Sequence, residues 1–132
     1  VKVVHDFGSS MNRAVDLGQV EGGIVQGIGW MTMEEIIYNE EGKLLSNALS
    51  TYKIPDIYAV PKILDVKFLN TDGNSMAILK SKAVGEPPLM YGIGAYFAIR
   101  NAVLAFNPAS DISYSAPITP EKVLMGLYSN GK

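Results

Sequence analysis

Apolar residues follow two different periods along the chain, and each period predicts a different kind of element. Residues 1–7 are rich in β-branched and aromatic side chains and end at Gly8, which predicts a strand. Residues 63–69 alternate apolar and polar side chains, the period of a half-buried strand. Residues 76–79 predict one more strand. Residues 36–45 predict two short strands around a turn at Glu41 and Gly42, and a further turn is expected at residues 72–73.

Apolar positions that recur every three or four residues predict the helices. Between residues 14 and 35 they fall on one stripe, formed by Leu17, Val20, Ile24, Ile28 and Met31. Residues 90–106 repeat the pattern, with candidate core positions at Ile93, Phe97, Ala98, Val103 and Leu104. A short last helix is predicted after Thr119, a preferred N-cap residue, with Pro120 at its first position and Glu121 in its first turn.

The first predicted helix contains more glycine than a helix normally tolerates. Each glycine costs about 1 kcal/mol relative to alanine, so this density indicates a packing reason, such as the close approach of another backbone or a bound group. At about 100° per residue, two adjacent faces consist of small and amide side chains: Gly18, Gly22 and Gly29 on one, and Gln19, Gly23 and Gln26 on the other. The sequence therefore predicts an apolar stripe on one side of the helix and a smooth glycine–glutamine groove on another.

The predicted strands and helices do not alternate strictly, so the expected class is α+β, with mixed strands, two main helices and a short C-terminal helix. A chain of 132 residues has the size of one domain or of part of one. It opens on Val1 rather than on methionine, directly in a strand-like run, which is consistent with an excised fragment or a processed chain. We expect residues 1–132 to form part of a larger domain.

Composition excludes several classes of function. Hydrophobic residues make up 48% of the chain, enough for a folded protein. The net charge is −2 and the basic residues are scattered, which argues against nucleic acid as a partner. No run approaches the roughly 18 consecutive apolar residues of a membrane span, and the first ten residues lack the apolar core of a signal peptide. We therefore expect neither a nucleic acid nor a membrane as partner.

Cysteine is absent from the chain. Residues 1–132 therefore supply no disulfide, no cysteine ligand for an iron–sulfur cluster and no zinc–thiolate site. The absence fits a cytoplasmic location, which we take as an expectation.

The segment at residues 80–89, KSKAVGEPPL, predicts a constrained loop that holds one carboxylate in place. Gly85 removes a side chain next to Glu86, so a large group can approach the backbone. Pro87 favours an extended conformation at Glu86, and both prolines fix their own φ. A helix begins within a few residues, and its N-terminus favours a negative charge. A rigid carboxylate that faces a concave surface suits a general base.

Plainer alternatives stay open for each candidate. From the residues alone, the commoner interpretation of Gly-Glu-Pro-Pro is a loop into a helix with a solvated glutamate. Lys80 and Lys82 are expected to hold Glu86 ionised, to meet a cofactor phosphate or simply to be exposed. His5, the one histidine of the chain, is expected to be hydrogen-bonded and structural, because no second ligand lies at metal-site spacing.

Four acidic residues also allow two interpretations. They are expected to form a solvated helix end and a turn rather than a metal cluster: Glu34, Glu35, Glu40 and Glu41. No residue of the chain is assigned as a metal ligand.

Several motifs, in one order, resemble the C-terminal part of the molybdenum subunit of the xanthine dehydrogenase family. They are GQVEGGIVQGIG at residues 18–29 with the acidic pair at 34–35, STYKIP at 50–55, SKAVGEPPL at 81–89 with the small-residue helix after it, and APITPEKVL at 116–124. Together they cover roughly residues 3 to 127. The VGEPPL form is closer to purine hydroxylases than to carbon monoxide dehydrogenases. The chain departs from the family at Asn12–Arg13, where Asn-Pro is common, which leaves the local turn uncertain.

The resemblance assigns roles to individual residues. Glu86 matches the family's catalytic glutamate, the general base that deprotonates a hydroxyl group on molybdenum. Gln19 matches a residue that hydrogen-bonds the molybdenum–pterin group, and Gly85 would let that cofactor approach. Gln26 lies two turns from Gln19 on the same face of the helix and is a further candidate contact.

The resemblance also implies what the chain belongs to. It would be a fragment of an oxidoreductase that hydroxylates a purine-like N-heterocycle, of the xanthine or hypoxanthine type, with water as the oxygen source. The molybdopterin cofactor would be shared with the remainder of the molybdenum subunit, and iron–sulfur clusters and FAD would lie on partner domains or subunits of an oligomer. Alone, the chain is expected to be inactive. The alternative is a stand-alone, non-catalytic binding or assembly module of the same fold.

Overall fold

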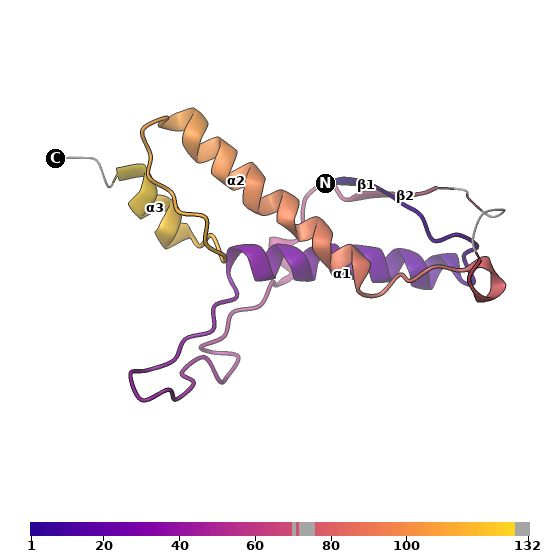
Figure 1. The fold of residues 1–132 in the computed structure, drawn as a ribbon, viewed down its shortest axis with the longest axis horizontal. Helices are drawn as coiled ribbons and strands as arrows, with labels where there is room; N and C mark the ends of the chain where they lie inside the picture. Colours follow the sequence, from indigo (N-terminus) through magenta and orange to yellow (C-terminus); the bar gives the residue numbers. More distant parts are fainter. Residues whose placement is uncertain (70, 72–75, 129–132) are drawn as a thin grey trace.

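The computed structural model describes residues 1–69, 71 and 76–128, so the turn expected at residues 72–73 lies outside the described residues. In chain order the elements are β1 (Lys2–His5), α1 (Arg13–Thr32), the 3₁₀ helix η1 (Ile57–Ala59), β2 (Asp65–Phe68), two further 3₁₀ helices, η2 (Ile78–Lys80) and η3 (Pro87–Gly92), then α2 (Ile93–Phe106) and α3 (Pro120–Tyr128) (Figure 1). The expected α+β class, with two main helices and a short C-terminal one, is confirmed.

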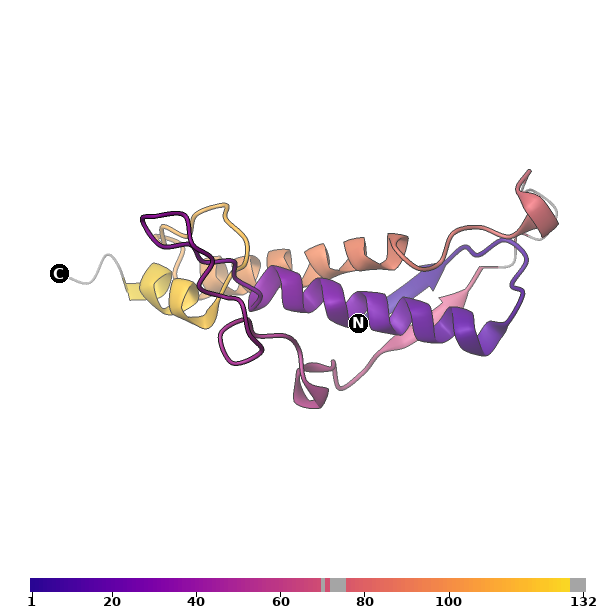
Figure 2. The ribbon, with the colours of Figure 1, turned by 90° about the horizontal axis from the view of Figure 1, so that it is seen from below.

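A two-stranded parallel sheet and α1 enclose the first core. β1 pairs with β2 in a register that runs from Lys2 opposite Asp65 to His5 opposite Phe68. Figure 2 shows α1 running beside the two strands. The buried residues of this core come from the strand end and from the predicted stripe of α1, and they are Phe7, Val20 and Ile24. The stripe deduced from the sequence is therefore the face that α1 turns to the sheet.

The helix termini follow the capping rules. The side chain of Asn12 accepts hydrogen bonds from the backbone nitrogens of Ala14 and Val15, at 3.2 and 3.3 Å, and so begins α1. Arg13 takes the first helical position, so the helix starts normally although the proline common in the family is absent. The hydroxyl of Thr119 accepts from the backbone nitrogen of Lys122 at 3.3 Å, which confirms the predicted start of α3.

The second core joins the C-terminal end of α1 to α2 and α3. Its buried residues are Tyr96, Val103, Ile112 and Ile118. Among the candidate core positions predicted for α2, Val103 is buried, whereas Phe97 is 47% exposed. One side of α2 is therefore covered by the described residues and the other is open.

Two of the predicted strands differ in the structure. The pair expected at residues 36–45 is reduced to a single antiparallel bridge between Tyr38 and Leu44, around Gly42 with φ +78°. The strand expected at residues 76–79 is wrong, because this segment leads into η2, where Leu79 has φ +53°. A short apolar run does not distinguish a strand from a turn.

One helical stretch among the described residues has the length and composition of a membrane span. It covers Pro87–Phe106, with a mean hydropathy of 1.3, and 17% of it is buried. The stretch begins with two prolines, packs on α1 and contains Arg100, whose guanidinium donates to the carbonyl oxygen of Ile112. Length and composition alone are therefore weak evidence for a place in a membrane.

Candidate functional site

The structure brings Gln19 of α1 next to Gly85, although 66 positions separate them in the sequence. A Cβ atom placed on Gly85 would lie 3.6 Å from Oε1 of Gln19, and no other heavy atom would come as near. Gln19, Gly85 and Glu86 are all exposed. Gln19 and Gly85 thus lie side by side, with Glu86 next in the chain, and all three are accessible.

The backbone of Glu86 differs from the expected extended conformation. Its φ of −83° and ψ of −40° are helical, because Glu86 is the N-cap of η3. A proline disfavours this conformation at the residue before it. Here the following turn overrides that preference, since Pro87 and Pro88 occupy its first two positions and the nitrogen of Leu89 donates to the carbonyl oxygen of Glu86 at 3.0 Å.

The carboxylate of Glu86 forms no capping hydrogen bond with η3. An N-cap side chain normally accepts from a backbone nitrogen in the first turn. Pro87 and Pro88 have no N–H group, and the next nitrogen, that of Leu89, is bonded to the main chain. The two prolines therefore fix the backbone after Glu86 while leaving its carboxylate available to another group.

Two glycines of α1 hold η3 in place. A Cβ on Gly23 would lie 2.8 Å from the side chain of Pro88, and one on Gly27 would lie 2.1 Å from the carbonyl oxygen of Leu89. Real Cβ atoms do not come so close, so the backbones meet only because these positions lack a side chain. The glycine density of α1 is explained here by backbone contact with η3.

The remaining glycines of α1 have other environments. Gly29 packs against Pro55, with a hypothetical Cβ at 2.2 Å, whereas Gly18 and Gly22 face open space. The predicted glycine–glutamine groove is therefore open near Gln19, at Gly18 and Gly22, and covered further along α1. Gln26 is exposed and lines a hollow together with Gly22, Glu34 and Tyr52.

The upstream side of the Glu86 loop is tied to the end of β1. The nitrogen of Ser9 donates to the carbonyl oxygen of Lys80, and the nitrogen of Lys82 donates to that of Phe7, both at 2.8 Å. The loop that carries Glu86 is thus fixed at both ends, by residues 7–9 on one side and by α1 on the other.

Lys82 pairs with Asp6 rather than with Glu86. This pair, a hydrogen bond from Thr71 and one from the nitrogen of Gly8 hold the pKa of Asp6 at about 2, below its usual 3.8. This role was not among the alternatives left open for Lys82: the lysine fastens the loop to the end of β1. No local pattern indicates this pair, since 76 positions separate its members.

His5 is buried and bonded to the same region. Its side chain is 6% exposed, and its Nδ1 lies 2.6 Å from the hydroxyl oxygen of Tyr91 in η3. A structural, hydrogen-bonded histidine was expected, and this is confirmed. Tyr91 was not recognised from the sequence.

The acidic residues near the end of α1 have partners of their own. Glu34 accepts from the hydroxyl of Tyr52 at 2.5 Å, and Glu35 pairs with Lys122 at 3.1 Å. Within the part of the chain that the structure describes, no three His, Cys, Asp or Glu side chains gather as a metal site would require.

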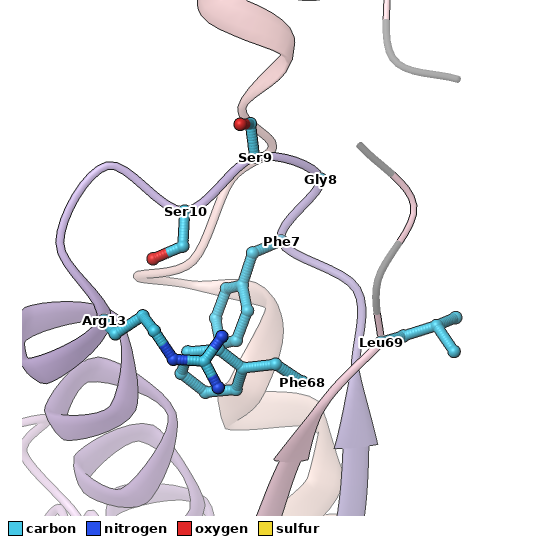
Figure 3. A pocket seen from close by; sticks show the side chains of 7 residues that line it. All are labelled: Phe7, Gly8, Ser9, Ser10, Arg13, Phe68 and Leu69. Atoms are coloured by element: carbon cyan, nitrogen blue, oxygen red, sulfur yellow. The ribbon is translucent and has the colours of Figure 1, made fainter. Parts of the chain in front are cut away.

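A small pocket lies at the start of α1, away from Glu86. Its volume is about 230 Å³, and Figure 3 shows the side chains that line it, with Arg13 lying over the ring of Phe68. The guanidinium carbon is 4.3 Å from the ring centroid, a cation–π contact. The hydroxyl of Ser10 donates to Asp16 at 2.5 Å. These polar groups are engaged in holding the helix start, so the pocket adds no candidate site residue.

Known proteins are similar to this chain in sequence and in fold. Residues 1–61 match the family described as molybdopterin cofactor-binding domain. Xanthine dehydrogenase/oxidase of Felis catus is 43% identical over 92% of this chain, and that of Rattus norvegicus is 45% identical over the same share. The chain belongs to the xanthine dehydrogenase family. It spans about 10% of the length of these curated relatives.

Solved structures agree with the family. Quinoline 2-oxidoreductase from Pseudomonas putida 86 superposes with a TM-score of 0.80 at 32% identity, over 94% of this chain and 15% of that one. A Cu,Mo-CO dehydrogenase shares the fold, with a TM-score of 0.74 at 23% identity. Aldehyde oxidase 1 of Oryctolagus cuniculus is also similar, at 42% identity over 127 residues, or 93% of this chain. Family membership therefore leaves the substrate undecided.

Proposed function

We propose that this chain supplies the general base, Glu86, and one wall of the molybdenum–pterin site of an enzyme that hydroxylates a purine-like N-heterocycle. The observation that carries the proposal is the meeting of Gln19 with Gly85, directly before a glutamate whose carboxylate has no capping bond. A hydrogen-bonding amide, an accessible stretch of backbone and a free carboxylate then share one exposed surface.

The residues present fit a large polar group that approaches from outside. The amide of Gln19 can both donate and accept hydrogen bonds. Gly85 has no side chain to keep a ligand off the backbone, and Gly18 and Gly22 leave open space on α1. Gln19 and Gly85 would therefore hold a molybdenum–pterin group shared with the rest of the subunit. Such a group, when bound, supplies the redox chemistry of hydroxylation.

The part of Glu86 would be to accept a proton from the oxygen nucleophile, which derives from water. A base must stay at hydrogen-bonding distance from the proton it takes. The loop around Glu86 meets this need, because residues 80–82 are bonded to residues 7–9 and η3 is pressed against α1. With no capping bond to break, the carboxylate can take the proton without loosening η3.

The proposal is tested by Glu86→Gln in the assembled enzyme, meaning this chain with the remainder of the molybdenum subunit and its partner domains. Glutamine keeps the size of the side chain and removes the proton acceptor. Since general-base catalysis contributes roughly 10²–10⁴-fold, kcat is expected to fall by that range while the molybdenum content stays at the wild-type value. Glu41→Gln, at an exposed turn residue, is the matched control. Near-normal turnover of a fully loaded Glu86→Gln enzyme would overturn the assignment.

The partners follow from the same proposal. We expect iron–sulfur and flavin domains or subunits to accept the electrons, and the isolated chain to neither retain molybdopterin nor hydroxylate purines. Large apolar side chains that lie exposed support the need for neighbours, among them Tyr58 at 92%, Leu49 at 79% and Phe106 at 70%. A stand-alone module predicts the opposite behaviour, a monodisperse chain that binds no apolar dye. A cytoplasmic location and an oligomeric state stay predictions.

A further inference from the structure

One hydrogen bond joins the sheet to the element that begins at Glu86. Nδ1 of His5, at the end of β1, lies 2.6 Å from the hydroxyl oxygen of Tyr91. The two rings meet edge to face, with centroids 5.7 Å apart and planes at 89°. Tyr91 lies in η3, whose N-cap is Glu86.

The imidazole of His5 is held in place by the sheet and by neighbouring rings. Its backbone is paired opposite Phe68, and its carbonyl oxygen accepts from the nitrogen of Leu69 at 2.9 Å. Its ring packs on that of Phe7 at 4.7 Å. A side chain held by sheet register and by two aromatic neighbours has little freedom to move.

The second ring nitrogen of His5 is buried and has no hydrogen-bond partner among the described residues. A buried polar atom without a partner is unfavourable. An apolar side chain would fill this place without that cost. The bond from Nδ1 to Tyr91 therefore offers a physical reason for an imidazole at this position.

The contacts of η3 with α1 are close packing without direction, and its C-terminal end runs directly into α2, where the nitrogen of Ile93 donates to the carbonyl oxygens of Met90 and Tyr91. Pro88 lies against Gly23, and the backbone from Leu89 to Gly92 lies against Gly27. The packing sets how near η3 approaches α1 and the junction with α2 fixes its C-terminal end, but the first turn, next to Glu86, can still twist at constant distance from α1. A short hydrogen bond is directional, so the bond at Tyr91 restricts that rotation. Because η3 is six residues of 3₁₀ helix, about two turns, and begins directly after Glu86, its rotation also moves Glu86.

We infer that His5 and Tyr91 are positioning residues for Glu86. Their hydrogen bond holds η3 in the rotation that keeps the glutamate aimed at the cofactor surface beside Gln19. Neither residue acts on the substrate; both act through Glu86. The inference rests on the proposed role of Glu86 as the general base.

The test compares Tyr91→Phe, His5→Leu and the double variant in the assembled enzyme. Tyr96→Phe is the control, since it likewise removes one hydrogen-bonded tyrosine hydroxyl, which donates to the carbonyl oxygen of Ser113 at 3.3 Å, but in the second core. Two properties are measured. The first is amide hydrogen exchange over residues 86–93, which needs no turnover. The second is kcat and KM per bound molybdenum.

Loss of the bond is expected to speed exchange over residues 86–93 about tenfold, while exchange over residues 2–8 changes little. It is expected to lower kcat about tenfold and to leave KM within about twofold, because binding groups are untouched. The double variant should be no worse than either single variant, since all three remove the same bond. His5→Asn, which keeps a hydrogen-bonding group near Nδ1, should recover most of the loss. Tyr96→Phe should match the wild type in both measurements.

Unchanged exchange in both single variants would overturn the inference, and so would losses that multiply in the double variant. If Tyr91→Phe does not fold, His5→Leu and His5→Asn decide, because loss with the first and recovery with the second require a hydrogen bond rather than mere bulk. The two proposals fail separately. If the Glu86→Gln enzyme is active, Glu86 is not the base, but the exchange result still shows whether the His5–Tyr91 bond holds η3. If exchange is unchanged and the Glu86→Gln enzyme is inactive, Glu86 is the base and only the positioning role is contradicted.

Discussion

The backbones of Gly27 in α1 and Gly92 at the end of η3 touch. A Cβ atom on Gly92 would lie 2.1 Å from the carbonyl carbon of Gly27, closer than any side chain can stand. Figure 1 shows α2 starting beside α1 and then diverging obliquely from it. The direction of α2 and the place of the Glu86 loop therefore both depend on the absence of two side chains.

The first prediction concerns this contact. Gly27→Ala would force the backbone of η3 away from α1, so we expect a loss of stability of about 1–3 kcal/mol, typical of overpacking. The loss is measured as a lower midpoint of thermal unfolding in the assembled enzyme, together with lower turnover. Gly94→Ala is the control, because a Cβ there meets nothing within 4 Å and alanine favours a helix. Equal stability of the two variants would contradict the contact.

The Gly27 contact also shows what the sequence could and could not predict. The apolar stripe of α1 was predicted correctly, since a helix must turn such a stripe to its core. The predicted groove included Gly23, on the face of Gln19 and Gln26, but not Gly27, and both of these glycines meet η3. The helical period predicts which residues share a face of a helix. Which face a distant segment packs against depends on the path of that segment.

The candidate site also has features that the sequence predicted and features that it did not. Glu86, Gly85 and Gln19 were found from motifs, and the fold brings the last two together. The conformation of Glu86 was mispredicted, because a local rule for residues before proline lost to the packing of η3 against α1. The pairing of His5 with Tyr91 joins segments 86 positions apart, and no local pattern encodes such a contact.

A second prediction separates folding from cofactor binding. A Cβ on Gly85 would lie at an ordinary distance from Gln19, 3.6 Å, so Gly85→Ala should fold with wild-type stability. If the cofactor lies against this backbone, the added methyl group should lower the molybdenum content severalfold. Metal analysis of the purified variant, beside its thermal unfolding, measures both effects. Full molybdenum content in a stable Gly85→Ala enzyme would show that the cofactor does not approach at this residue.

A third prediction follows from Asp6. Its pKa in the folded chain is about 2, chiefly because Lys82 and Thr71 bond to its carboxylate, whereas the ordinary value is 3.8. The unfolded chain therefore takes up this proton first as the pH falls. Asp6 stabilises the fold fully above about pH 4, and the contribution is lost as the pH falls towards about 2.

The measurement is the denaturant midpoint of the wild type and of Asp6→Asn at several pH values. The difference between them should stay constant from about pH 7 to pH 5 and then shrink below about pH 4. Asp111→Asn, at an exposed aspartate, should differ little from the wild type throughout. A wild-type advantage that persists unchanged at about pH 2 would contradict the ion pair.

The fourth prediction concerns the STYKIP segment, whose Tyr52 donates to Glu34 at 2.5 Å. This bond, together with burial, raises the pKa of the phenol above its usual 10.0. A raised pKa means that the folded state holds the proton more tightly than the unfolded chain does. The bond therefore stabilises the fold fully below about pH 10 and is lost as the pH rises through the pKa of the folded state.

Tyr52→Phe should lower the unfolding midpoint by the same amount at pH 7 and pH 9, and by progressively less above pH 10. Glu34→Ala, which removes the acceptor, should reduce the pH dependence, and adding Tyr52→Phe to it should cost less than in the wild type, since the two residues share one bond. Additive losses in the double variant would mean that the two side chains contribute independently and that Tyr52 stabilises the connection between α1 and β2 through its ring alone.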